Sequence, residues 1–444
     1  MIGSRANAAS VGIVRWHPAA GNLDASLQQA PLSKVLSDIS ALTGWDVMVE
    51  PGLQKLVSTR FEGLPLNQGL RRILGDLNFA LLQGERGEKK LYIYQLSLSS
   101  ATQSLVADNE AHPKSRRIEN ELIVTLDPDS PETIEQIAER LNAEVVGKID
   151  GMNAYRLRFK DAAATEVARQ DLASNDSVAV ADNLEVDIPA RLASLNFGNS
   201  SRPRVRIDPN PDSEKVIVGL IDTPVQAEGV SASEFLLPTI SVAGEGVPIS
   251  DEPTHGTTMA ETLLRGLEMV EDGGQGSNVR ILPVDVYGSE EVTSTFQVAA
   301  GVVAAIDSGA RIINLSLGGQ ETTPFLQELI SDAHQQGVVF IGAAGNEPGT
   351  HNIFPAAYPE VVAVTSSDRS GGVANYANNG AFVDLMVPGH SYVSFNGETY
   401  LINGTSASAA YVSGITAGVA ASTGAPMVQV ESQIRGSLPK PPSN

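Results

Sequence analysis

The sequence predicts a doubly wound α/β domain with a mostly parallel sheet, preceded by two small α+β domains. First, residues 205–444 alternate apolar runs with stretches of helical periodicity. Second, runs such as Val216 to Ile221 are apolar throughout, which is typical of strands buried on both faces of a parallel sheet. Third, polar side chains follow where these runs end, at the sheet edge where this fold class binds ligands.

The elements of the large domain follow from the positions of the apolar runs. The expected strands are Val216–Ile221, Arg280–Val286, Arg311–Leu317, Val338–Ala343 and Val361–Thr365. The expected helices between strands are Phe296–Asp307 and Pro324–Gln336. The small-residue run from Ala409 to Ala421 is apolar on nearly all sides, so we expect a buried helix there.

Residues 1–98 are predicted to form the first small domain, with two helices and several strands. Apolar residues from Leu32 to Leu42 recur at helical spacing and are followed by Gly44, which favours a helix end. A hairpin is predicted from Phe79 to Leu96. Residues 99–117 are polar and poor in large apolar groups, which indicates a linker.

Residues 118–188 are predicted to form the second small domain. Their pattern reads β-α-β-β-α-β, which is typical of a ferredoxin-like fold and by itself indicates no function. Residues 189–204 are predicted to link this domain to the large domain at 205–444.

The composition excludes several classes of function. The formal net charge of −22 argues against nucleic-acid binding, which needs a basic surface. The absence of cysteine excludes thiol catalysis, disulfides and cysteine-ligated zinc. No run of about 18 apolar residues predicts a membrane span. Residues 1–6 lack the apolar core of a signal peptide, so the protein is either cytoplasmic or exported with its signal peptide absent from this chain.

Four polar side chains stand at ends of predicted strands and helices. Asp222 ends the first strand, His255 opens a helical stretch, Asn346 follows a strand, and Ser406 precedes the small-residue helix. Each alone is more often a turn or cap residue. A serine at a helix N-terminus, however, lies beside unpaired N–H groups and a favourable dipole, which a nucleophile that forms an oxyanion requires.

Asp222, His255 and Ser406 follow the order Asp, His, Ser, and residues 205–444 resemble the subtilases, a family of serine endopeptidases with that order. The resemblance is carried by five phrases, Val218–Thr223, His255–Thr257, Asn314–Gly319, Ala343–Asn346 and Gly404–Ser406. It implies a subtilisin-like fold and hydrolysis of peptide bonds through an acyl-enzyme.

The resemblance also implies a role for each residue. Ser406 would be the nucleophile, His255 the general base, and Asp222 the group that orients the imidazole. The Asn346 side chain and the Ser406 backbone N–H would form the oxyanion hole.

A substrate site is implied by the same resemblance. One substrate-pairing edge would be Ser316, Leu317 and Gly318, and the opposite wall of the first specificity pocket would be Ala343, Ala344 and Gly345. Because small residues stand on both sides, we expect the pocket to take a medium or large apolar side chain.

No cofactor or metal is expected. The stretch between Glu261 and Val279 lacks a recognisable loop of oxygen ligands, and the acidic residues nearby are expected to be solvated surface. These are Asp251, Glu252, Asp272 and Asp285.

Departures from the family pattern motivate a second reading. Pro224, Glu261 and the run Ala407–Tyr411 differ from the usual subtilase residues. They favour a weakly active or inactive binding or scaffold protein of the cell envelope as the alternative. The retention of all four polar groups favours the enzyme.

The two small domains carry resemblances of their own. Residues 118–188 resemble subtilase propeptides at Asn142–Val146 and Val178–Asn183, which implies a zymogen whose own propeptide assists folding and inhibits the enzyme. The tail Glu185–Arg204 would lie in the cleft and be cut between Ile188 and Arg204. The alternative is a second structural domain.

Residues 1–98 resemble the short N-terminal domain of secretins and TonB-dependent receptors. The likeness is carried by Leu32–Leu36, Thr43–Val47 and Phe61–Leu66. It implies an extracytoplasmic setting, periplasmic or secreted, and contact with an envelope protein. An ordinary packing module is the alternative.

Overall fold

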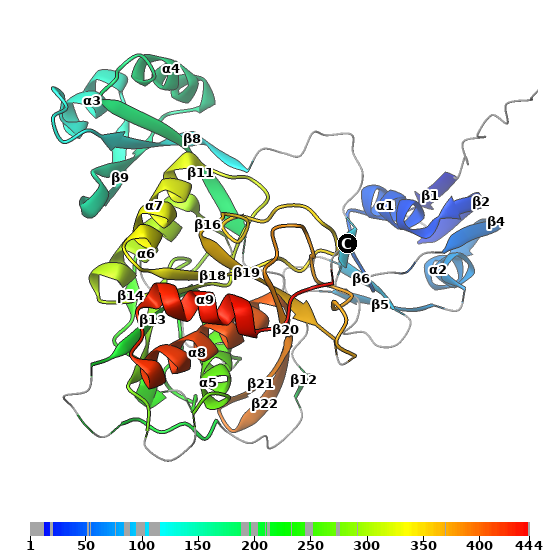
Figure 1. Ribbon diagram of the computed structural model, residues 1–444. Helices are drawn as coiled ribbons and strands as arrows, with labels where there is room; N and C mark the ends of the chain where they lie inside the picture. The colour runs from blue at the N-terminus through cyan, green and yellow to red at the C-terminus, as the bar shows by residue number, and fades with distance from the viewer. Residues whose placement is uncertain are drawn as a thin grey trace, which may run out of the picture. The chain divides into compact units, whose positions relative to one another are not determined.

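The chain folds as two compact units, Met1–Ser115 and Arg116–Asn444, and each is described by itself (Figure 1). No helix in the described part of the chain is long and apolar enough to cross a membrane. The computed structural model describes residues 13–17, 21–50, 53, 55–75, 77–83, 89–94, 103–105, 116–187, 195–196, 203–208, 210, 214–231, 233–244, 252–271, 276–290, 292–368 and 370–442.

The first unit is a small α+β domain with two sheets and two helices. Its elements are β1 Ile13–His17, β2 Asn22–Pro31, α1 Leu32–Thr43, β3 Asp46–Val49, β4 Leu56–Pro65, α2 Leu66–Leu74, β5 Asn78–Gln83, β6 Lys89–Tyr94 and β7 Gln103–Leu105. One sheet has the order β1-β2-β4 and the other β5-β6-β3-β7. Leu36, Leu70 and Leu91 are fully buried in one shared core.

The predicted helix and hairpin of this unit are confirmed, but its C-terminal end differs from the prediction. Helix α1 stops at Gly44, whose φ of 69° suits a residue without a side chain. The predicted linker 99–117 contains β7, which pairs antiparallel with β3 so that Leu105 lies opposite Val47. A three-residue strand is too short to show alternation, and its partner lies more than fifty residues earlier in the sequence.

The second small domain has the predicted β-α-β-β-α-β order. Its elements are β8 Arg117–Leu126, α3 Ile134–Leu141, a 3-10 turn Asp150–Met152 after β9 Glu144–Ile149, β10 Ala154–Arg158, α4 Ala162–Leu172 and β11 Val178–Asp187. The sheet order is β16-β11-β8-β10-β9, in which β16, Val292–Ser294, comes from the large domain. The two domains therefore share one sheet.

The large domain is built on a seven-stranded sheet in the order β14-β15-β13-β17-β18-β19-β20, with every pair parallel. The predicted doubly wound fold is thus confirmed. The strands of this sheet are β13 Val216–Asp222, β14 Ile240–Ser241, β15 Val279–Asp285, β17 Ile312–Leu315, β18 Val339–Ala343, β19 Val361–Ser367 and β20 Leu385–Pro388.

Helices cover both faces of this sheet, and a small antiparallel sheet lies beside it. The helices are a 3-10 turn Ser233–Phe235, α5 His255–Glu268, α6 Thr295–Asp307, α7 Pro324–Gln335, α8 Thr405–Thr423 and α9 Met427–Ser437. The small sheet has the order β12-β22-β21, with β12 Leu195–Asn196, β21 His390–Phe395 and β22 Glu398–Asn403.

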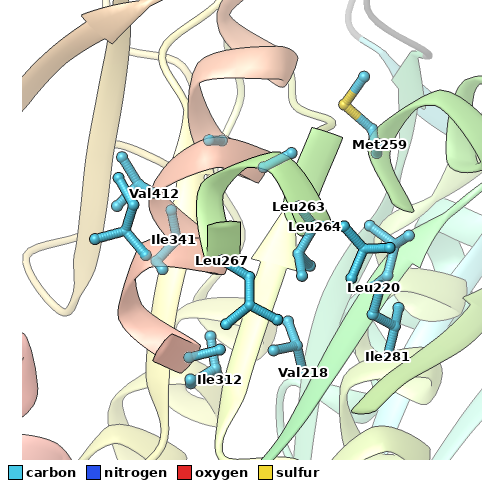
Figure 2. Close-up of a cluster of buried hydrophobic side chains, with 14 of the residues drawn as sticks. Val218, Leu220, Met259, Leu263, Leu264, Leu267, Ile281, Ile312, Ile341 and Val412 are labelled. Carbon is cyan, nitrogen blue, oxygen red and sulfur yellow. The ribbon is translucent and has the colours of Figure 1, made fainter. Parts of the chain in front are cut away.

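Each face of the sheet has its own apolar core. Residues of α5, α8 and α9 form one core with the sheet, and residues of α6 and α7 form the other. Figure 2 shows Leu263, Leu264 and Leu267 of α5 beside Val218 and Leu220 of β13. All five side chains are almost completely buried. Burial of such side chains contributes about 1.5–3 kcal/mol each, so this core fixes α5 on the sheet.

Two glycines bring α5 and α8 into backbone contact. A Cβ at Gly266 of α5 would lie 2.2 Å from the carbonyl oxygen of Tyr411, and one at Gly414 of α8 would lie 1.9 Å from that of Leu263. Neither distance can accommodate a side chain. The close crossing fixes the position of the N-terminus of α5 relative to that of α8, where the candidate site residues lie.

Candidate active site

Asp222 and His255 form a buried pair at the carboxyl end of β13, an interior strand of the sheet. Asp222 is the last residue of β13 and is 2% exposed; His255 is the first residue of α5 and is 7% exposed. Imidazole Nδ1 lies 2.8 Å from Asp222 Oδ1 and 3.0 Å from Oδ2. Because an ionised carboxylate only accepts, Nδ1 carries the proton and Nε2 of the neutral ring is left as an acceptor.

Thr223, which follows Asp222, and Gly256, which follows His255, hold the pair in place. The Thr223 backbone N–H donates to Asp222 Oδ1 at 2.7 Å, and the Gly256 N–H donates to the Thr223 hydroxyl at 2.8 Å. Thr254 caps α5 by accepting from the Thr257 N–H. The start of the helix is therefore tied to the end of the strand.

Ser406 is the second residue of α8, at the helix N-terminus. It is 3% exposed, and its Oγ has no hydrogen-bond partner within the described part of the protein. Its carbonyl oxygen accepts from the Ser316 hydroxyl at 3.2 Å, which ties α8 to the segment after β17. A buried hydroxyl is usually paired, so the unpaired one of Ser406 calls for an explanation.

Asn346 lies beside the start of α8 with its amide orientation fixed. Its Oδ1 accepts from the Thr405 N–H at 2.8 Å and from the Thr405 hydroxyl at 3.0 Å. That hydroxyl accepts in turn from the Gly345 N–H at 3.1 Å. With the oxygen so engaged, the two Nδ2 hydrogens are left to donate to another acceptor. The orienting contact of Thr405 with Asn346 was not predicted, since a threonine at the start of a helix has no distinctive sequence signature.

The strand β11 of the small domain lies against the segments predicted to bind substrate. It pairs antiparallel with β16, and its last residue, Asp187, forms an antiparallel bridge with Gly318. The buried Tyr287 hydroxyl donates to the Asp187 carbonyl oxygen at 3.1 Å. Burial, together with the charges of Asp222 and Asp187, raises the pKa of Tyr287 well above its ordinary value. Tyr287 was not singled out from the sequence.

A second contact fixes the small domain on helix α6. The buried Asn183 side chain accepts from the backbone N–H of Phe296 at 3.2 Å, and the Leu184 N–H donates to the Thr295 hydroxyl at 3.1 Å. Asn183 thus satisfies an unpaired donor of the first helical turn. The Arg156 guanidinium lies 5.5 Å from the centre of the Phe296 ring.

The other predicted pocket residues lie on adjacent parallel strands or just after them. Ser316 and Leu317 follow β17 and are buried; Ala343 ends β18, and Ala344 follows it. The Ala344 N–H donates to the Val364 carbonyl oxygen at 2.9 Å. Strands β17 and β18 are neighbours in the sheet, so the two predicted walls start side by side.

The departures from the family pattern are accommodated by the fold. Glu261 is fully buried in α5, and both of its carboxylate oxygens lie 2.7 Å from the Ser231 hydroxyl. Helix α8 runs without interruption through Ala407 and Ala410. The proline that subtilases usually have in this helix is therefore not required for the helix to form.

One of the acidic residues expected on the surface is buried, so that expectation was wrong. Asp285 is 1% exposed, and its carboxylate accepts from the N–H groups of Tyr287 and Gly288 and from the Ser241 hydroxyl. It caps the turn after β15. Asp251 and Asp272 lie outside the described residues. Among those described, no group of three or more His, Asp or Glu side chains is placed to hold a metal ion.

Comparison with known proteins identifies the family. A model of the subtilase family matches residues 213–433. Subtilisin DY of Bacillus licheniformis is 32% identical over 212 residues, which cover 75% of that protein and 46% of this chain. The chain belongs to the subtilase family. Thermitase of Thermoactinomyces vulgaris is 32% identical over 169 residues, covering 60% of that protein and 38% of this chain.

The small domain before the subtilase domain is a prodomain. A model of the fervidolysin N-terminal prodomain matches residues 106–182. The crystal structure of fervidolysin from Fervidobacterium pennivorans, a keratinolytic enzyme related to subtilisin, has a TM-score of 0.55 and 19% identity, covering 72% of this chain and 57% of that one. This subtilase is therefore a serine endopeptidase made with a prodomain, and the predicted fold class, function and family are confirmed.

Proposed function

We propose that Asp222, His255 and Ser406 form the catalytic triad of this endopeptidase. One observation carries the assignment. The buried Ser406 hydroxyl has no partner among the described residues and stands at the N-terminus of α8, while the buried Asp222 carboxylate holds His255 Nδ1 and so leaves Nε2 as an acceptor. The hydrogen bond from Ser406 to His255 forms with substrate, since catalytic hydrogen bonds are often long in uncomplexed sites.

The proposed reaction follows from these roles. Ser406 Oγ attacks the scissile carbonyl carbon as its proton passes to His255 Nε2. Asp222 stabilises the resulting imidazolium through Nδ1–H. The C–N bond then breaks, and the imidazolium donates its proton to the leaving amine. Water attacks the acyl-enzyme, with His255 again as base, which releases the acid and restores Ser406.

Asn346 and the Ser406 backbone N–H are proposed as the oxyanion hole. Thr405 engages Asn346 Oδ1 through two hydrogen bonds, so the Nδ2 donors are oriented before substrate arrives. The Ser406 N–H belongs to the first turn of α8 and lacks an intrahelical acceptor. Donors fixed in advance stabilise developing negative charge without reorganisation.

We propose that β11 occupies the substrate site until the chain cuts itself. Asp187 pairs with Gly318 on one side while β11 pairs with β16 on the other, which is how an extended substrate would add a strand between the two edges. Cleavage is expected between Ile188 and Arg204, as the sequence predicted.

The test compares the chain with its Ser406→Ala and Ser422→Ala variants. Ser422 lies on the same helix but is exposed near its C-terminal end, so its variant controls for the loss of a hydroxyl from α8. The unmodified chain and Ser422→Ala should process themselves and react with a fluorophosphonate probe. Ser406→Ala should stay full-length and unlabelled. Equal labelling of Ser406→Ala would overturn the assignment.

We further propose an extracytoplasmic enzyme whose first unit contacts an envelope protein. The proposal is supported by the resemblance of residues 1–98 to the short N-terminal domain of secretins. An open hollow on α2 and its neighbours would suit an acidic segment of the partner; it is lined by Leu64, Asn67, Gln68, Arg71, Arg72 and Phe79. Binding of residues 1–115 to isolated envelope proteins, lost on replacing Arg71 and Arg72 by Glu, tests it.

A further inference from the structure

One side chain lies between the two walls of the first specificity pocket. A Cβ built on Gly318 would lie 2.8 Å from Cγ2 of Ile353, and a Cβ built on Gly345 would lie 3.1 Å from Cγ1 and 3.6 Å from Cδ1 of the same residue. Gly318 belongs to one proposed wall and Gly345 to the other. The Ile353 side chain therefore contacts both walls, in the space that small wall residues would otherwise leave open.

Backbone hydrogen bonds hold Ile353 at that place. The next residue, Phe354, pairs with Gly319, donating to its carbonyl oxygen at 2.7 Å and accepting from its N–H at 2.9 Å. The Ile353 carbonyl oxygen accepts from the Ala357 N–H at 2.7 Å. Because a β-branched side chain also has few rotamers, Ile353 has little freedom to move aside for a substrate.

The same loop is tied to the opposite wall by one buried side chain. The Asn378 Nδ2 group donates to the carbonyl oxygens of Ala344 at 3.0 Å and of His351 at 2.7 Å. Its backbone N–H donates to the Gly345 carbonyl oxygen at 3.0 Å. Asn378 is fully buried. The segment before Ile353 and the wall at Gly345 are therefore fixed to each other as one piece, while Ile353 itself keeps part of its surface exposed.

We propose that Ile353 determines specificity by closing the first specificity pocket, so that the enzyme prefers Gly, Ala or Ser on the acyl side of the scissile bond. This inference rests on the proposed substrate site and refines it. It replaces the medium or large side chain expected from the small wall residues alone. A larger residue such as Phe would overlap Ile353, whose branched side chain cannot retract.

The chain's own processing region offers an internal test. Between Ile188 and Arg204 lie small residues such as Ala190, Ala193 and Ser194, and also Leu192, Leu195 and Phe197, which a spacious apolar pocket would select. The mature N-terminus, read by mass spectrometry, should follow a small residue. A cut after Leu192, Leu195 or Phe197 would contradict a closed pocket.

The direct test uses matched peptide substrates that differ only in Ala or Phe on the acyl side. The processed enzyme should favour Ala over Phe in kcat/KM by about 100-fold, the scale on which pockets reject misfitting apolar groups. Ile353→Gly should raise the Phe-to-Ala ratio by a similar factor, with Ile353→Ala raising it less. Ile306→Ala, which shortens a half-buried isoleucine on α6, should leave the ratio unchanged.

Each outcome bears on a different proposal. Equal cleavage of the Ala and Phe peptides by an enzyme that the fluorophosphonate probe labels would overturn the role of Ile353 and leave the triad standing. A Phe-to-Ala ratio of kcat/KM that Ile353→Gly leaves unchanged would likewise overturn the role of Ile353 and leave the triad standing. Absence of labelling and of cleavage in every variant would instead overturn the proposed function. If Ile353→Gly does not fold, the graded change expected of Ile353→Ala decides the question.

Discussion

The two halves of the candidate active site differ in how fully their buried polar groups are paired. Asp222 accepts from His255 and from the Thr223 N–H, so the base and its orienting group are bonded in advance. Ser406, buried to the same degree, has a hydroxyl with no partner among the described residues. An unpaired buried hydroxyl costs about 1–3 kcal/mol. The fold thus orients the proposed base in advance and leaves the hydroxyl of the proposed nucleophile without a partner.

Among changes that leave Ser406 in place, disruption of the Asp222–His255 pair should have the largest effect. Asp222→Asn replaces an acceptor-only carboxylate by an amide that can donate to Nδ1, so the imidazole should adopt the other tautomer and lose its acceptor at Nε2. We expect kcat to fall by about 10⁴-fold, measured on a peptide substrate with enzyme matured in trans. Asp332→Asn, an exposed change on α7, is the control and should retain full activity.

Asn346→Ala should have the next largest effect, because it removes a transition-state donor while leaving the Asp222–His255 pair intact. The expected loss in kcat is about 10²–10³-fold with little change in KM, a range known from the equivalent donor in subtilisin. Fluorophosphonate labelling should slow but persist. A large rise in KM with unchanged kcat would contradict the assignment, since it would mean that Asn346 binds the ground state.

Thr405 tests the other half of the site without removing a proposed catalytic group, because its hydroxyl bonds Asn346 and Gly345 and not the Ser406 hydroxyl. Thr405→Val removes one of the two bonds to Asn346 Oδ1 and the acceptor for Gly345 N–H. We expect kcat to fall by about 10-fold, consistent with the loss of one hydrogen bond. Thr405→Ser keeps the hydroxyl and should restore most of the rate. Equal losses in both variants would point to packing instead.

The smallest effect is expected where the prodomain meets the catalytic domain. Tyr287→Phe, made in the Ser406→Ala chain to prevent processing, loses the bond to the Asp187 carbonyl and should cost about 1 kcal/mol of stability at pH 8. Burial raises the pKa of Tyr287 in the folded state above its ordinary value. The contribution of Tyr287 to the free energy of unfolding is therefore fully present below about pH 10 and is lost as the pH rises further.

Urea unfolding at pH 8 and at pH 10.5 measures this difference. The stability gap between the Tyr287 chain and the Phe variant should narrow at the higher pH. A gap that widens there would show that the phenol ionises more readily in the folded chain, contrary to its burial.

The sequence was sufficient to predict five of the seven strands of the parallel sheet, because these runs are apolar throughout, but not β14 and β20. The runs ending at Ile221 and Ala343 became β13 and β18 with ends within one residue of those expected. Short or polar strands escaped prediction. Strand β7 has three residues, and β16, also of three residues, pairs with a strand of another domain.

The sequence by itself predicted the identity and order of the candidate catalytic residues, because residue types and short motifs are local features of the chain. Which of them are bonded was decided only by the tertiary structure. The Asp222–His255 contact joins residues 33 apart in the sequence, and the Asn346–Thr405 bond joins residues 59 apart. The size of the proposed substrate pocket could also not be predicted from the sequence. Small walls predicted open space, but Ile353, on a loop without periodicity, contacts both Gly318 and Gly345 from a third segment, and we propose that it fills that space.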